Sequence, residues 1–274
     1  MLHVALFGIH KLLIDSLTAL HRGNLLPEIV IFPQVVSAYH HAVVDFCKKH
    51  SIRFLRPKSV NDPQFINEIR KLAINRIVVT GYNEIFCSEL IALGSSGAIN
   101  CHGGLMPEER GPVPYKWAIY DNRESTGVTY HQMTEKLDRG KIYVKNFIKI
   151  GSNENSQDLF EKICIDFCKT VPLFFISSDL GHWFKDESED NLIKGKYKGQ
   201  IPPSLTHFDL SLSYDELNRR VRAFSPRPGV FFKTKGQTML VKKISNSLED
   251  ANEQSIVLQV QDGNIAITEF EIIS

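Results

Sequence analysis

The stretch that decides the fold is Ile99–Pro107, which reads Ile-Asn-Cys-His-Gly-Gly-Leu-Met-Pro. Two glycines and a proline follow the polar pair Asn100 and His102, so we expect a strand to end at the histidine and to open into a turn. Residues two apart on a strand project from the same face, which places the amide beside the imidazole. Ligands of open α/β sheets usually bind at this end of the strands. The sequence therefore predicts a polar site here.

The chemistry open to this pair is acyl transfer. An imidazole can accept and return a proton near neutral pH, and a side-chain amide can donate to an oxyanion that forms on a carbonyl. A histidine in a half-buried strand is more often structural, so a partner is needed to orient the ring. Asp138 is the candidate, because it follows the alternating run Thr126–Met133 and lies in a turn before Gly140. Asn100, His102 and Asp138 form the candidate catalytic set.

The first two thirds of the chain alternate short apolar runs with amphipathic segments, as βαβ units do. Leu2–Phe7 is apolar throughout and ends at Gly8, which is typical of a strand buried on both faces of a parallel sheet. We predict an α/β fold with a Rossmann-like, open, mainly parallel sheet and helices on both faces. The expected strands lie near residues 2–7, 29–32, 52–55, 76–80, 98–102, 126–133 and 142–150, and the expected helices near residues 11–21, 39–50, 65–72, 113–120 and 155–180.

The end of the chain has a different pattern. A charged stretch near residues 185–198 suggests a linker. A helix is expected at Tyr214–Phe224, with Ser213 and Glu216 as its capping box, followed by several short strands. We expect residues 1–183 to form the catalytic domain, 184–205 a linker, and 206–274 a small C-terminal β-rich module with one helix.

The composition is that of an ordinary globular protein. The 274 residues include 32 Lys and Arg against 31 Asp and Glu, so the formal net charge of +1 gives no global field for a polyanion. Five cysteines without paired spacing, and an apolar N-terminus without a basic flank, indicate reduced thiols and a cytoplasmic location. Cys164 and Cys168 lie four apart, but no nearby Cys or His completes a metal set, so no metal is expected.

The chain resembles the formyltransferases that take their one-carbon unit from N10-formyltetrahydrofolate. The shared motifs are Asn100-Cys101-His102, Leu105-Met106-Pro107, Arg110-Gly111, Pro114, and Gly127-Val128-Thr129 followed by Asp138-Arg139-Gly140. In that family an Asn, a His and an Asp form the catalytic set, and they match Asn100, His102 and Asp138. One departure is Gly104, where the family usually has serine, so a hydroxyl beside the catalytic set is missing.

The resemblance also implies where the donor, a folate co-substrate, would bind. In the family the loop that corresponds to Thr80–Cys87 embraces the pterin ring, largely through backbone groups. Ile85 and Phe86 could flank that flat ring or, equally well, anchor the following helix. The candidate donor-binding residues are Tyr82, Ile85, Phe86, Met106 and Asp138.

The C-terminal part bears a second resemblance. Asp209–Ser213 and Arg222–Gly229 are similar to the start of a region shared by methionyl-tRNA and sugar formyltransferases. This argues against the shorter glycinamide ribonucleotide formyltransferases. The acceptor is then either an amino-deoxysugar carried on a nucleotide or methionine carried on initiator tRNA.

The two acceptors make different demands on the sequence. The tRNA enzymes are expected to have a long basic insertion after the second strand, whereas Pro33–His41 contains no Lys or Arg. The chain also ends sooner than we would expect of them. We predict a sugar N-formyltransferase that serves surface glycans such as the lipopolysaccharide O-antigen, acting as a homodimer without a nucleic-acid or membrane partner. The candidate substrate-binding residues are Arg110, Tyr115 and Trp117. A folate- or sugar-nucleotide-binding protein without catalysis is the remaining alternative.

Overall fold

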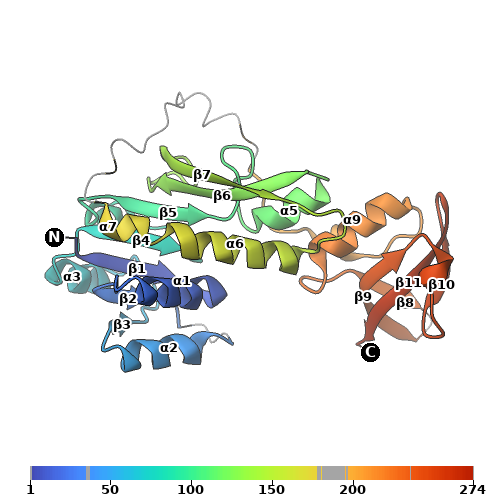
Figure 1. Ribbon diagram of the computed structural model, residues 1–274, viewed down its shortest axis with the longest axis horizontal. Helices are drawn as coiled ribbons and strands as arrows, with labels where there is room; N and C mark the ends of the chain where they lie inside the picture. The colour runs from blue at the N-terminus through green and yellow to red at the C-terminus, as the bar shows by residue number, and fades with distance from the viewer. Residues whose placement is uncertain are drawn as a thin grey trace. The chain divides into compact units, whose positions relative to one another are not determined.

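The computed structural model describes residues 2–34, 38–177, 180, 195, 197–234 and 236–273, whose strands form two sheets (Figure 1). The first sheet has the order β3-β2-β1-β4-β5-β6-β7. Its strands are β1 (Val4–Gly8), β2 (Ile29–Ile31), β3 (Arg53–Leu55), β4 (Arg76–Thr80), β5 (Ala98–His102), β6 (Ser125–Gln132) and β7 (Ile142–Lys149). The first five strands run parallel, and β6 pairs antiparallel with β5. The predicted open, mainly parallel sheet is confirmed.

The strand order predicts a ligand-binding crevice at the C-terminal ends of the central strands of this sheet. β1 has β2 on one side and β4 on the other, so the chain winds outward in both directions from β1. The loops that follow β1 and β4 must therefore diverge, and ligands of doubly wound sheets bind at such a point. The helices that precede the second sheet in the chain include α1 (His10–Arg22), α2 (His40–Lys49), α3 (Pro63–Lys71), α4 (Ser88–Ala92), α5 (Pro114–Tyr120), α6 (Ser156–Thr170) and α7 (Leu173–Ile176).

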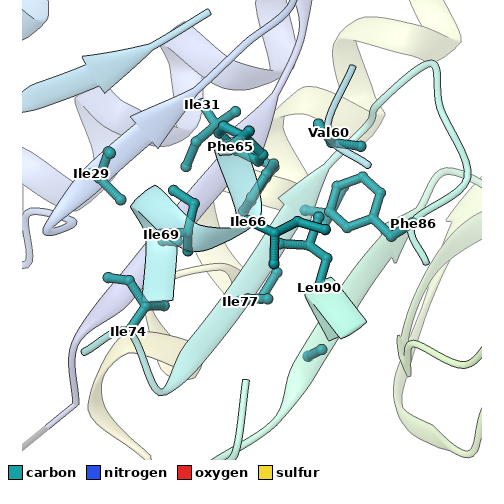
Figure 2. Packing of buried hydrophobic residues seen from close by; sticks show 14 residues of the cluster. Ile29, Ile31, Val60, Phe65, Ile66, Ile69, Ile74, Ile77, Phe86 and Leu90 are labelled. Carbon is teal, nitrogen blue, oxygen red and sulfur yellow. The ribbon is translucent and has the colours of Figure 1, made fainter. Parts of the chain in front are cut away.

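One face of the sheet is covered by α3 and α4. Asp62 begins α3 by accepting a hydrogen bond from the Gln64 amide at 2.7 Å, and Pro63 occupies the first turn. The apolar side chains of α3 and α4 then pack on alternate residues of β1, β2 and β4, as Figure 2 shows. The labelled members of this cluster are Ile29, Ile31, Val60, Phe65, Ile66, Ile69, Ile74, Ile77, Phe86 and Leu90.

The opposite face is covered by α1 and α6, which Figure 1 shows in front of the sheet. α1 begins directly after β1, and a Cβ atom on Gly8 would lie 2.6 Å from the Thr80 hydroxyl and 3.0 Å from Leu13. This close approach requires glycine at the end of β1. Helices therefore lie on both faces, as predicted.

The prediction of one long helix over residues 155–180 is wrong. α6 ends at Thr170, and the short helix α7 begins after Pro172. Proline lacks the N–H group that a continuing helix needs and its ring clashes with the preceding turn, so the chain breaks here and restarts. In the described part of the chain, no helix is both long and apolar enough to cross a bilayer.

The second sheet is antiparallel and has the order β10-β11-β9-β8, which confirms the predicted C-terminal β module. The elements of this C-terminal part of the chain are η2 (Pro203–Thr206), α9 (Tyr214–Phe224), β8 (Phe231–Thr234), β9 (Gln237–Ser245), η3 (Leu248–Asp250), β10 (Ile256–Val260) and β11 (Gly263–Ile272). Ser213 caps α9, because its hydroxyl accepts from the Glu216 amide at 3.3 Å.

The chain divides into two compact units whose boundaries differ from the predicted domains. The first unit comprises Met1–Arg110, Gly127–Ile148 and Glu161–Tyr197, and the second comprises Gly111–Thr126, Lys149–Phe160 and Lys198–Ser274. The second unit thus takes in α5, whose Trp117 and Tyr120 rings pack on Phe224 of α9 at 6.0 and 5.3 Å between centroids. Most of the predicted linker, 184–205, lies outside the described residues.

Two isoleucines of α6 allow a matched test of this packing. Ile163 is 1% exposed and Ile165 is 53% exposed, although they lie on the same helix. We expect Ile163→Ala to lower the free energy of unfolding by about 2–5 kcal/mol, because it leaves a cavity in the core. Ile165→Ala should change it by less than about 0.5 kcal/mol. Urea denaturation of both variants measures this, and equal losses would contradict the packing of α6.

Candidate active site

A pocket lies at the C-terminal ends of β4 and β5 in the first unit. β6, which pairs with β5, and the loop that follows β4 also line it. Polar groups meet here at the C-terminal ends of the strands, which is the side of an open α/β sheet where ligands bind. The lining residues used below are Tyr82, Ile85, Phe86, Asn100, His131 and Asp138. We call this site the edge pocket.

Asn100 faces the edge pocket and is held by its cross-strand neighbour. In the antiparallel register Asn100 lies opposite His131, so both side chains project from the same face. Asn100 Nδ2 lies 3.1 Å from His131 Nε2. One amide hydrogen is used in this bond, and the second is left for a ligand in the pocket.

The surroundings of His131 fix its protonation state. Its Nδ1 lies 2.9 Å from the carbonyl oxygen of Gln132, so Nδ1 carries the hydrogen and Nε2 accepts from Asn100. Burial lowers the pKa of His131 to about 4, because desolvation outweighs the attraction of Asp138. His131 therefore stays neutral at neutral pH and is a poor base there. Its geometry suits it to orient Asn100.

His102 has a different environment. It is buried, and its Nε2 lies 2.6 Å from the backbone carbonyl of Glu109, so Nε2 carries a hydrogen. The basic lone pair of the neutral ring must then be on Nδ1, which lies 3.9 Å from Asp138 Oδ1. A proton taken up on Nδ1 would create an imidazolium that faces a carboxylate, which stabilises the charge.

Asp138 reaches the two rings from a strained turn. Its backbone is left-handed, with φ of +50°, and its carboxylate lies 3.9 Å from His102 Nδ1 and 3.7 Å from His131 Nε2. Gly140 closes the turn, and a Cβ atom there would meet the Gln132 carbonyl oxygen at 1.7 Å. The turn thus depends on glycine. The three residues predicted as the catalytic set are brought together in space.

Two further residues, Glu109 and Thr129, shape the loop after β5, and neither belongs to the predicted catalytic or binding residues. The Glu109 carboxylate accepts from the Leu105 amide at 2.7 Å, while the Glu109 amide donates to the Leu105 carbonyl at 2.9 Å. Thr129 lies opposite His102 in the register and donates to the Gly104 carbonyl at 2.7 Å. These bonds hold the loop so that the Glu109 carbonyl meets His102. The register of β6 was the available signal for Thr129.

The residues predicted to contact the donor take different positions. Ile85 and Phe86 both line the edge pocket, but Ile85 is 59% exposed, whereas Phe86 is buried and packs on Phe7 at 4.9 Å between ring centroids. Ile85 thus fits the ring-flanking alternative, and Phe86 also anchors its loop. Tyr82 lines the pocket. Met106 is fully buried against Ile142 and is not among the lining residues.

The residues predicted to bind the acceptor are divided between the units. Arg110 belongs to the first unit and is only 4% exposed. Burial lowers its pKa, as does Arg139, while Asp138 raises it, so its guanidinium lies within electrostatic reach of the candidate catalytic carboxylate. Tyr115 and Trp117 belong to the second unit, where the Trp117 indole donates to the Gly199 carbonyl at 3.1 Å. Their contact with an acceptor stays a prediction.

A second pocket opens beside the edge pocket in the same unit. It lies at the C-terminal ends of β1 and β2 and is lined by Ile9, His10, Phe32, Tyr39, His40 and Asn83, among others. Asn83 lines this pocket while its neighbours Tyr82 and Glu84 line the edge pocket, so one loop separates the two. Burial lowers the pKa of His40, which favours the neutral ring. We call this site the side pocket.

Metal ligation finds no support among the described residues. No group of three or more His, Cys, Asp or Glu side chains there is arranged to hold an ion.

Family models and sequence relatives agree on one family. The formyl transferase model matches residues 32–166, and the model of the formyl transferase C-terminal domain matches residues 200–269. The methionyl-tRNA formyltransferase of Geobacter metallireducens is 28% identical over 218 residues, which cover 80% of this chain and 70% of that protein. That of Geobacter sulfurreducens is 28% identical over 245 residues, covering 82% and 73%.

Solved structures add a likeness of fold. An N-formyltransferase from Helicobacter canadensis, in complex with folinic acid and dTDP-3-aminofucose, has a TM-score of 0.71 at 16% identity and matches 99% of this chain and 100% of its own. A sugar 3N-formyltransferase in the presence of dTDP and 5-N-formyl-THF has a TM-score of 0.67 at 18% identity, with 98% of both chains matched. Because the two formyl transferase models together match well over half of its length, this chain belongs to the formyl transferase family.

Proposed function

We propose that this protein formylates the amino group of a nucleotide-linked amino-deoxysugar, with N10-formyltetrahydrofolate as the donor. The observation that carries the proposal is the grouping of Asn100, His102 and Asp138 at the end of β5. An oxyanion donor, a base with a fixed tautomer and a carboxylate are the groups that acyl transfer to an amine requires. The proposed homodimer and cytoplasmic location remain predictions.

The edge pocket suits the donor in shape and in hydrogen-bonding groups. Ile85 and Leu137 are exposed apolar side chains on its walls, and each can lie against a flat ring. Asn100 and Asp138 supply polar contacts at its inner end. A folate would thereby present its formyl group to the amide.

The residues divide the work of the transfer between them. As the acceptor nitrogen attacks the formyl carbon, the carbonyl electrons move to oxygen, and the free amide hydrogen of Asn100 donates to that oxyanion. His102 takes the proton that the nitrogen loses, and Asp138 stabilises the imidazolium. When the tetrahedral carbon releases N10, the bond between them breaks and His102 returns the proton to N10.

The side pocket supports a nucleotide-linked acceptor. Its walls carry aromatic and imidazole rings, and Pro33, Tyr39 and Val43 come from a segment without Lys or Arg. A phosphodiester chain is bound mainly by cations, whereas a sugar or base is held by apolar and hydrogen-bonding walls. The match in fold over the whole chain to an enzyme crystallised with dTDP-3-aminofucose points the same way.

Methionyl-tRNA is the second candidate acceptor. The sequence relatives at 24–28% identity described as methionyl-tRNA formyltransferases favour it. The donor and the catalytic set would be the same in both cases, so only the acceptor differs.

The base is tested by replacing His102. We expect His102→Asn to lower kcat by about a hundred- to ten-thousandfold, because proton transfer loses its base while folate binding is retained. His21→Asn, on the exposed side of α1, is the matched control and should keep full turnover. Near-normal kcat in His102→Asn would remove this residue from the mechanism.

The role of His131 is tested by a double-mutant cycle with Asn100. Asn100→Ala should reduce kcat by roughly a hundredfold or more, since an oxyanion donor is lost. His131→Ala should also reduce kcat, but it should add little in the Asn100→Ala background, because His131 acts through that amide. If the two fold-losses of kcat multiply in the double variant, His131 acts independently of Asn100.

The acceptor is tested by competition. We expect formylation of nucleotide-linked aminosugars, no formylation of methionyl-tRNA, and only a modest loss of rate between low and physiological salt. A tRNA enzyme would lose affinity steeply with salt, because each phosphate contact releases counterions. Both acceptors are offered with the same donor, and the products are separated by mass. Efficient formylation of methionyl-tRNA with inert sugar nucleotides would overturn the choice of acceptor.

A further inference from the structure

A polar groove lies entirely within the second unit. α9 forms one wall, and the chain that follows α5 and β7 forms the other. Its volume is about 860 Å³, within the range of about 300–1,000 Å³ typical of small-molecule sites. We call it the α9 groove, and the transfer chemistry described above uses none of its residues.

Cations outnumber anions on the walls of the α9 groove. Arg123, Lys149, Arg219 and Arg222 line it, against the carboxylates of Glu124 and Asp215. The whole chain has a formal charge of only +1, so this groove concentrates positive charge in an otherwise balanced protein. A concave site of one sign attracts ligands of the opposite sign.

Two of these cations stand close together on α9. Arg219 and Arg222 are three residues apart, so they lie on the same face of the helix. Arg222 is half-buried, and its Nη1 donates to the Glu154 carbonyl at 3.2 Å, while no described residue accepts from its Nε. Burial lowers the pKa of Arg222, and Arg219 lowers it further by repulsion. A bound anion would relieve both penalties.

We propose that the α9 groove binds a phosphorylated sugar unit, such as the ribose phosphates of a nucleotide. The arginines would hold the phosphate groups, because a guanidinium binds phosphate in a bidentate manner. Asp215, Glu124 and Asn218 would accept hydrogen bonds from sugar hydroxyls. The inference does not depend on the acceptor proposed above.

The two carboxylates argue against a nucleic-acid strand as the occupant. A phosphodiester backbone would pass Glu124 and Asp215 with its own negative charges, and like charges repel. A small ligand can instead turn its phosphates toward the arginines and its hydroxyls toward the carboxylates. The groove therefore favours a compact phosphorylated ligand.

The test measures binding of ADP to the full chain by isothermal titration calorimetry. Arg219→Glu reverses one charge of the groove, and the Arg219 side chain makes no hydrogen bond or ion pair with the described residues. We expect it to weaken ADP binding by about ten- to a hundredfold, which is the range for a lost charge-assisted hydrogen bond. Lys243→Glu reverses an exposed charge on β9 and should leave ADP binding unchanged. Arg219→Gln replaces Arg219→Glu if the latter does not fold.

Two further probes identify the chemistry that is bound. Inorganic pyrophosphate should compete with ADP but bind more weakly, because it lacks the sugar hydroxyls. Absence of ADP binding at millimolar concentration, or equal affinity in Arg219→Glu and the unmodified protein, would overturn the proposal. It would also be overturned if Arg219→Glu weakened binding of a single-stranded RNA but not of ADP. None of these binding measurements depends on catalytic turnover, so their outcome is independent of the formyl-transfer assays.

Discussion

The antiparallel pairing of β5 with β6 is the constraint on which the site depends. Its register sets Asn100 opposite His131 and His102 opposite Thr129. Because side chains alternate along a strand, a slip of one residue would turn both partners to the other face of the sheet. The amide would then lose its acceptor and the loop after β5 would lose its support. In a sheet whose first five strands run parallel, the reversal of direction between β5 and β6 creates the arrangement.

The same pairing extends its effect into the loop after β5. Thr129 donates to the Gly104 carbonyl at 2.7 Å and accepts from the Met106 amide at 3.0 Å. The loop then closes on itself through Glu109, whose carbonyl fixes the hydrogen on His102 Nε2. The hydrogen bond from Thr129 is accepted by the backbone carbonyl of residue 104, not by a side chain. Glycine can therefore form it at this position, where the family usually has serine. The orientation of the base is thus built from backbone groups that a motif does not reveal.

The sequence predicted what depends on neighbours in the chain. The spacing of Asn100 and His102 predicted one shared face, and Gly140 marked the turn that carries Asp138. Contacts made through the backbone were not predictable in the same way: the hydrogen bond between Glu109 and His102 uses a carbonyl, which every residue has. The boundaries of the two units depend on a long-range contact, since α5 packs against α9 although the two helices lie far apart in the chain. Pro172 is a local signal for the break between α6 and α7. It was overlooked because the apolar residues on either side of it continue the spacing of one helix.

Net charge is a poor guide to where cationic side chains gather on this protein. A formal net charge of +1 excludes a strong electrostatic field around the whole protein. It does not reveal the local excess of positive charge in the α9 groove, where four cationic side chains lie with two carboxylates. The same local reasoning separates His102 from His131, which stand at nearly equal distances from Asp138. Each meets a backbone carbonyl at one nitrogen, but only His131 accepts at the other, from Asn100. His102 keeps its lone pair toward the carboxylate, so position within the hydrogen-bond network, rather than residue type, decides which ring can serve as the base.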